Sequence, residues 1–99
     1  MIKNHQLKFL AICNPEFYKN PHLDIPIFYR QLAKDSRIDF YHLPTQNVFQ
    51  TESSHREIQV APVANTLTYE KFLQLNSQAK RWHHIDSFDL VFCRTLKPF

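Results

Sequence analysis

The chain has 99 residues, a length that limits it to one small domain with a single core, and its formal net charge is +3. Its 43% hydrophobic and 14% aromatic content is too apolar for a disordered tail at this charge. No apolar run approaches the ~20 residues needed to span a bilayer, and no signal-peptide pattern opens the sequence, so we expect a cytoplasmic protein.

Glycine is absent from the sequence, although average usage would give about seven residues. Phosphate-binding loops need glycine where the backbone approaches the phosphate or takes a positive φ. We therefore expect no phosphate-binding loop, no dinucleotide fingerprint and no nucleotide held by this chain itself. Turns are expected to use Pro, Asn, Asp and Ser instead.

The first half of the sequence predicts a strand, a helix and a second strand. Residues 6–12 form an almost continuous apolar run, which is typical of a strand buried on both faces. A loop over 14–23 leads to a helix with Asp24 as its N-cap, ending at Asp35. Residues 37–43 alternate as a strand, which a crossover helix places parallel to the first. The apolar face of the helix has members at three- and four-residue spacing: Ile25, Phe28, Tyr29, Leu32 and Ala33.

The second half predicts a short hairpin, a helix and a final strand. Residues 48–51 and 57–63 are expected to pair as antiparallel strands. Thr68 is expected to cap a helix over 69–81, and residues 88–93 to form a buried strand. A helix would normally cover such a strand, so either this chain is a piece of a longer protein or another surface covers it. The inward residues of the helix would be Phe72, Leu73, Leu75 and Ala79.

The densest basic stretch covers residues 80–84, which read Lys-Arg-Trp-His-His. One aromatic side chain among basic groups could stack a nucleic-acid base. Because the other lysines and arginines are scattered, we favour the solvated end of a helix, with cations near its negative dipole end. Nucleic-acid binding is therefore not the expected function.

Several short motifs resemble the N-terminal domain of prokaryotic glutathione synthetases. They are Ala11-Ile12-Cys13-Asn14-Pro15, Asp24 opening a helix, Ile38-Asp39-Phe40-Tyr41, and Asp89-Leu90-Val91-Phe92-Cys93-Arg94 followed by Pro98-Phe99. Together they span almost all of the chain. The resemblance implies one pre-ATP-grasp domain over 1–99. Its fold would be a small Rossmann-like, three-layer α/β arrangement with a mainly parallel sheet and a short β-hairpin insertion.

The resemblance also implies a function. The complete family enzyme joins γ-glutamylcysteine to glycine with ATP and Mg²⁺, and its N-terminal domain contributes to the peptide pocket and to oligomer contacts. We therefore expect a substrate-binding and oligomerisation domain of such a ligase, with a peptide or amino-acid substrate. ATP and Mg²⁺ would bind an ATP-grasp part outside this chain, which itself would hold no catalytic residue, metal or cofactor. The alternative is a free-standing protein-interaction module that keeps the fold without catalysis.

Arg94 is the first candidate for substrate binding. It directly follows the last predicted strand, and open α/β folds bind ligands at the carboxyl edge of the sheet. A guanidinium there can hold a carboxylate through two parallel hydrogen bonds, and the resemblance places the matching arginine against the peptide substrate. The alternative is a purely structural arginine that caps carbonyls or pairs with Asp24 or Asp89.

Three residues of the first loop are further candidate substrate contacts. The resemblance places Asn20 near substrate, while Asn14 stands where the family has an aspartate and so removes a charge from the pocket edge. Asparagine also suits turns for local reasons. Tyr18 would wall the pocket or pack as a lid. Cys13 and Cys93 end strands expected to be neighbours, and we expect two small buried hydrophobes rather than a disulfide or metal site.

Overall fold

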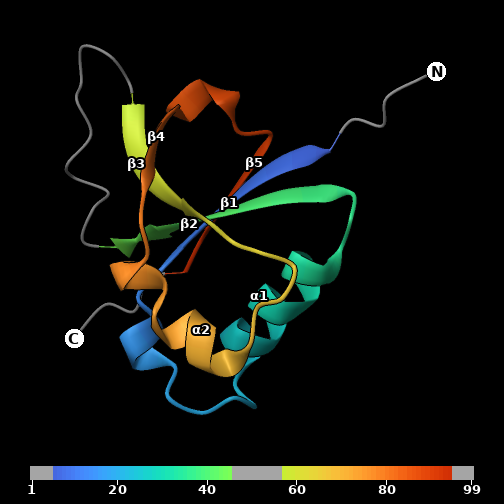
Figure 1. Cartoon of the computed structure of the whole chain (residues 1–99), viewed down its shortest axis with the longest axis vertical. Coiled ribbons are helices and arrows are strands. Elements are labelled where there is room, and N and C mark those ends of the chain that lie inside the picture. Colours follow the sequence, from blue (N-terminus) through green and yellow to red (C-terminus); the bar gives the residue numbers. More distant parts are fainter. Residues whose placement is uncertain (1–5, 46–56, 95–99) are drawn as a thin grey trace.

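The computed structural model describes residues 6–45 and 57–94, which form one five-stranded sheet with helices packed against it (Figure 1). In chain order the elements are β1 (Leu7–Cys13), the 3-10 helix η1 (Pro15–Phe17), α1 (Asp24–Lys34), β2 (Ile38–Pro44), β3 (Glu57–Pro62), α2 (Tyr69–Leu73), η3 (Leu75–Ser77), β4 (Arg81–His84), η4 (Ile85–Ser87) and β5 (Leu90–Cys93). Across the sheet the strand order is β4-β3-β2-β1-β5.

The sheet is mixed, with a parallel half and an antiparallel half. Strand β1 pairs in parallel with β2 and with β5, which confirms the predicted parallel strand–helix–strand unit. By contrast, β3 is antiparallel to both β2 and β4. The expectation of a mainly parallel sheet is therefore corrected to a mixed one. The predicted strand over 48–51 lies outside the described residues, and β3 joins the main sheet.

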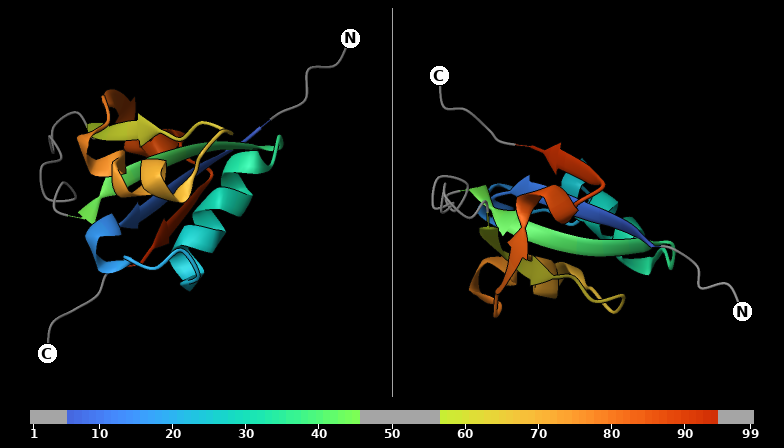
Figure 2. Two further views of the ribbon diagram at one scale, coloured as in Figure 1. Left: turned by 60° about the horizontal axis from the view of Figure 1, so that its bottom comes forward. Right: turned by 90° about the horizontal axis from the view of Figure 1, so that it is seen from above.

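The two faces of the sheet carry different cores. Figure 2 shows α1 and α2 on one side of the sheet and η4 on the other. The core on the helix side is built on alternate residues of β1 and β2, such as Phe9, Ala11 and Phe40, which pack against Tyr29 and Phe72. On the other side Ile85 and Phe88 pack against a smaller core, made of Leu10, Ile12, Leu43, Ile58 and Val60. The period-2 alternation of the strands supplies both cores.

Helix α1 follows the predicted apolar face but begins one residue earlier than expected. Leu23 is the residue at the N-cap, and Asp24 is the first helical residue, with Oδ1 accepting the N–H of Ile25 at 2.9 Å. Aspartate in the first turn still complements the positive end of the helix dipole. Tyr29 and Ala33 are buried, and Phe28 and Leu32 are partly buried against the same core.

The predicted helix over 69–81 is wrong beyond Leu73. Thr68 caps α2 as expected, since its Oγ1 accepts the N–H of Lys71 at 3.2 Å, but the helix ends after five residues. The 3-10 turn η3 follows, and the stretch expected to end the helix instead forms β4, an edge strand. Asn and Ser in 74–78 favour turns, and pairing with β3 outweighs the weak helical preference of Trp82, His83 and His84. Of the expected inward residues, Phe72 and Leu75 are buried, but Leu73 and Ala79 are exposed.

The final strand is an edge strand, not the buried strand expected from its apolar run. β5 pairs only with β1 in the described sheet, and Leu90 and Val91 are 50% and 53% exposed. Only Phe92 packs inward, with its ring centroid 4.9 Å from that of Phe28. Apolarity alone does not distinguish a central strand from an edge strand. No helix among the described residues is long and apolar enough to cross a membrane.

Candidate functional site

The carboxyl ends of β1, β2 and β5 meet at one edge of the sheet, which we call the carboxyl edge. Cys13 of β1 lies opposite Pro44 of β2, and Ile12 lies opposite Cys93 of β5. The backbone N–H of Arg94 donates to the carbonyl of Ile12 at 2.8 Å. The parallel sheet therefore brings the beginning of the first loop and Arg94 together, at the edge where open α/β folds bind ligands.

Arg94 points its guanidinium to the start of α1. Its Nη2 lies 3.1 Å from Oδ2 of Asp24, and the two side chains are 44% and 61% exposed. This is the ion pair considered above as the structural alternative for Arg94. A guanidinium has five donors, so this one contact leaves most of them unused by residues 6–45 and 57–94.

A hollow of about 360 Å³ adjoins this ion pair, between α1 and β5. Apart from the two charged residues, its lining is apolar except for the amide of Gln31. The residues that line it are Asp24, Ile25, Ile27, Phe28, Gln31, Phe92 and Arg94. Such a combination of an apolar wall and a few polar groups is typical of small-molecule sites.

The two candidate asparagines serve local turns. Asn14 Oδ1 accepts the N–H of Glu16 at 3.3 Å and so caps η1, while Asn20 Oδ1 accepts the N–H of His22 at 2.9 Å. Neither residue lines the hollow beside Arg94. The turn-forming role that sequence reasoning considered for both is therefore present, and the four candidates are not gathered around one cavity.

Tyr18 packs into the core on the helix side of the sheet and does not line the hollow. Its carbonyl accepts the hydroxyl of Tyr69 at 3.2 Å. Its own hydroxyl oxygen is buried and has no hydrogen-bond partner in the described part of the chain. Burial raises the pKa of this phenol, with Cys13 acting in the same direction and Arg94 against it. A buried hydroxyl without a hydrogen-bond partner is energetically costly. The Tyr18 hydroxyl is therefore a polar group near the carboxyl edge that could still form a hydrogen bond.

A buried chain of hydrogen bonds, which sequence reasoning missed, leads from the core to the carboxyl edge. The thiol of Cys13 donates to the Tyr29 hydroxyl at 3.2 Å, and that hydroxyl lies 2.7 Å from Nδ1 of His42. Nε2 of His42 lies 2.9 Å from Oδ1 of Asn76, whose Nδ2 donates to Asn14 Oδ1 at 3.4 Å. Because an amide oxygen only accepts, His42 donates from Nε2 and accepts from Tyr29 at Nδ1.

These hydrogen bonds require a neutral His42 imidazole, because Nδ1 can accept from Tyr29 only when it carries no proton. Burial lowers the pKa of His42 to about 4, with the bond to Asn76 opposing the shift and Lys80 adding to it. Burial likewise raises the pKa of the Cys13 thiol to about 11 and that of Tyr29 well above its usual value. The three groups are therefore neutral at physiological pH. They stabilise the packing of η3 on β2, and Cys13 has no thiolate character that a nucleophile would need. The signal in the sequence was a histidine among the apolar positions of β2.

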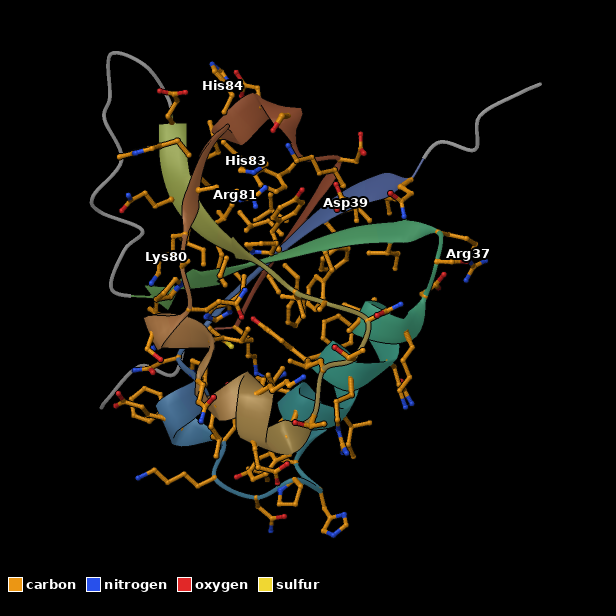
Figure 3. All side chains as sticks on the ribbon, in the orientation of Figure 1. Arg37, Asp39, Lys80, Arg81, His83 and His84 are labelled. Carbon is orange, nitrogen blue, oxygen red and sulfur yellow. The ribbon has the colours of Figure 1, made fainter. Side chains whose placement is uncertain are left out.

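Lys8, Arg81 and His83 lie on the other face of the sheet, whereas the ammonium of Lys80 lies beside η3 and donates to the carbonyls of Asn76 and Gln78. Figure 3 shows Arg81 and His83 on β4, away from α1 and α2. The Lys8 ammonium donates to Nδ1 of His83 and to Oγ of Ser87, both at 2.8 Å, and lies 4.7 Å from the ring centroid of Phe88. Burial and Lys8 together lower the pKa of His83, because a neighbouring cation disfavours imidazolium. The Lys8 ammonium is thus engaged within the fold.

The two cysteines are both free, and only one is buried. Cys13 is buried as expected, whereas Cys93 is exposed because β5 is an edge strand. Within residues 6–45 and 57–94 no group of three or more His, Cys, Asp or Glu side chains is placed to hold a metal ion.

Comparisons with known proteins found no relative of this chain. The chain matches no protein-family model, and no curated protein or solved structure matches it either.

Proposed function

We propose that this chain is the substrate-binding and oligomerisation domain of an ATP-dependent carboxylate–amine ligase similar to glutathione synthetase. Its fold would then be the small Rossmann-like, three-layer pre-ATP-grasp arrangement, working in the cytoplasm. ATP and Mg²⁺ would act in an ATP-grasp part outside this sequence, in the same polypeptide or in a partner. This chain would supply a site for the carboxylate of an amino acid or small peptide.

The position of Arg94 is the observation that supports this proposal. Its backbone N–H bonds to the carbonyl of Ile12 at the end of β1, and its guanidinium is half-exposed beside the hollow between α1 and β5. A guanidinium fixed at the mouth of an apolar hollow binds a carboxylate through charge-assisted hydrogen bonds. Its fixed backbone reduces the entropy lost when the ligand binds.

The ion pair with Asp24 does not block such a ligand. Both side chains are largely exposed, and exposed ion pairs contribute less than about 1 kcal/mol to stability. Hydrogen bonds to charged groups contribute about 1.5–3 kcal/mol when well formed. A ligand carboxylate that makes two bonds to Arg94 therefore gains more than it displaces.

Calorimetric titration with γ-glutamylcysteine tests the proposal. We expect the wild-type chain to bind and Arg94→Gln to bind on the order of tenfold more weakly, because about 1.4 kcal/mol of charge-assisted bonding is lost. The matched control is Arg37→Gln, which removes the same charge from another exposed Arg–Asp pair, that with Asp35. Arg37 lies between α1 and β2 (Figure 3) and does not line the hollow.

Two outcomes contradict the proposal. One is a wild-type chain that does not bind the dipeptide at millimolar concentration. The other is an equal loss of affinity in Arg94→Gln and Arg37→Gln, which would reduce the effect to net charge. Circular dichroism of all three proteins confirms that each variant is folded.

A second function, a protein-interaction module, is favoured by one observation. β5 is an edge strand whose Leu90 and Val91 are half-exposed. An exposed apolar edge strand is a template for pairing with another chain, and a second copy of this chain is the simplest partner.

Sedimentation velocity over a range of concentrations tests this second function. We expect a reversible dimer that Val91→Thr weakens while the strand is kept, because threonine has the same branched shape. Leu73→Gln, which changes an exposed apolar residue of α2, is the control and should leave the dimer unchanged. A chain that stays monomeric at every concentration contradicts self-association.

A further inference from the structure

The hollow between α1 and β5 combines two opposite charges at one end with a remainder that is apolar except for the amide of Gln31. Nη2 of Arg94 and Oδ2 of Asp24 are 3.1 Å apart, and both residues line the hollow. Its volume of about 360 Å³ lies within the ~300–1,000 Å³ range of small-ligand sites. The charge pattern therefore gives information on the ligand beyond the presence of a carboxylate.

We infer that this hollow binds the zwitterionic head group of a free α-amino acid that has an apolar side chain. The inference rests on the proposed function, since it takes the same site as a ligand site. It goes further by naming the substrate class and by assigning a binding role to Asp24.

Asp24 makes the site less favourable for a ligand that brings only negative charge than for a ligand that also brings an ammonium. A carboxylate held by Arg94 would lie next to the Asp24 carboxylate, and like charges repel. An α-amino acid places its ammonium one carbon away from its carboxylate. Its carboxylate can then face Arg94 while its ammonium faces Asp24, so that four charges alternate in sign and the protein ion pair need not break.

The remainder of the hollow is suited to an apolar side chain. Ile27 and Phe28 of α1 and Phe92 of β5 line it, and the Phe28 and Phe92 rings lie 4.9 Å apart. Burial of an apolar side chain against these residues contributes about 25 cal/mol per Å² of surface removed from water. A charged or strongly polar side chain would lose hydration there without a charged partner among the lining residues other than the pair itself.

A panel of phenylalanine derivatives tests this inference by calorimetric titration of the whole chain. L-phenylalanine has both charges, N-acetyl-L-phenylalanine has only the carboxylate, and L-phenylalanine amide has only the ammonium. We expect L-phenylalanine to bind wild type, and each derivative to bind at least about tenfold more weakly, because each loses one charge-assisted contact. Glycine, with the same head group and no side chain, should also bind more weakly.

Two variants separate the roles of the charges. Asp24→Asn keeps an acceptor for the N–H of Ile25 but removes the negative charge. In this variant N-acetyl-L-phenylalanine should bind at least as tightly as L-phenylalanine, which reverses the wild-type order. Arg94→Gln should weaken binding of both carboxylate-containing ligands, and Arg37→Gln should leave the wild-type order and affinities unchanged.

The outcomes distinguish this inference from the proposed function. If N-acetyl-L-phenylalanine binds wild type as tightly as L-phenylalanine, and Arg94→Gln weakens both, the zwitterion inference is overturned and the carboxylate site stands. If glycine binds as tightly as L-phenylalanine, the apolar part of the inference is overturned. If neither these ligands nor γ-glutamylcysteine binds in an Arg94-dependent manner, both the inference and the proposed function are overturned.

Discussion

Two arginine–aspartate pairs lie at opposite ends of the parallel strands and use their donors differently. Arg37, beside the amino end of β1, donates to Asp35 from Nε at 2.9 Å and from Nη2 at 2.7 Å, and its backbone N–H donates to the same carboxylate at 2.9 Å. Among the described residues, the guanidinium of Arg94 at the carboxyl end makes a single contact, 3.1 Å from Asp24. Arg37 uses three of its N–H groups on Asp35 within one local turn, whereas the guanidinium of Arg94 keeps donors that a ligand could use.

The carboxyl end of the sheet has further unused polar groups. The hydroxyl oxygens of Tyr18 and of Thr45, which follows β2, are both buried without a hydrogen-bond partner among the residues the structure describes. Buried polar groups are normally paired, so unpaired ones concentrated at one end need a reason. A ligand-binding edge is such a reason, and the following experiments test the contrast between the two ends.

The largest expected effect concerns the pH dependence of stability at the carboxyl end. The folded pKa of His42 is lowered to about 4 from 6.5, so folding favours the neutral ring. The contribution of neutral His42 to the free energy of unfolding is complete above pH 6.5. It is lost as the pH falls from 6.5 to 4, because the unfolded state binds the proton first. Over this range the free energy of unfolding should fall by about 1.4 kcal/mol per pH unit. Chemical denaturation of wild type and His42→Gln at successive pH values measures this difference. Equal slopes in the two proteins would contradict a buried neutral His42.

An intermediate effect is expected from removing one hydroxyl on each face of the sheet. Tyr29→Phe leaves the Cys13 thiol and Nδ1 of His42 without their buried partner, which should lower the free energy of unfolding by about 1–3 kcal/mol. Tyr41→Phe removes a 3.0 Å bond to Asp39 on the other, more accessible face and should cost less. Urea denaturation at neutral pH compares them. A larger loss of unfolding free energy in Tyr41→Phe than in Tyr29→Phe would contradict a stabilising role for the buried hydrogen bonds of Tyr29.

The smallest effect concerns the Arg37–Asp35 pair at the amino end. The Arg37 guanidinium lowers the pKa of Asp35 to about 2 from 3.8, chiefly through its side-chain hydrogen bonds. In Arg37→Gln this pKa should return toward 3.8, as measured by a carboxyl carbon NMR titration, with little change in the fold. An Asp35 pKa that stays near 2 in the variant would show that another group lowers it.

The parallel half of the fold was predictable because its signals are local. The continuous apolar run of β1, the 3- and 4-residue spacing in α1 and the alternation of β2 each identify one element, and chain order then sets their parallel pairing. The antiparallel half was not predictable in this way. Whether 80–84 continues a helix or forms a strand depends on pairing with β3, a tertiary contact that a local pattern does not contain.

The candidate site shows the same division. Arg94 was found because it follows a strand, and its place at the carboxyl edge follows from sheet geometry. The hollow beside it was not foreseen, since its apolar wall comes from Phe28 and Phe92, which are 64 residues apart by their numbers and meet only in the folded chain. The buried hydrogen bonds of His42 were also missed, because its partners Tyr29 and Asn76 belong to separate elements.

The most direct test of the central claim is a map of backbone amide shifts when L-phenylalanine is added to the isotopically labelled chain. We predict that the largest shifts fall in 24–31 and 92–94, around the hollow beside Arg94, and that at the same ligand concentration they are much smaller in Arg94→Gln but unchanged in Arg37→Gln. Shifts confined to Lys8 and 81–88 on the other face, or no shifts at millimolar ligand, would contradict a ligand site at the carboxyl edge.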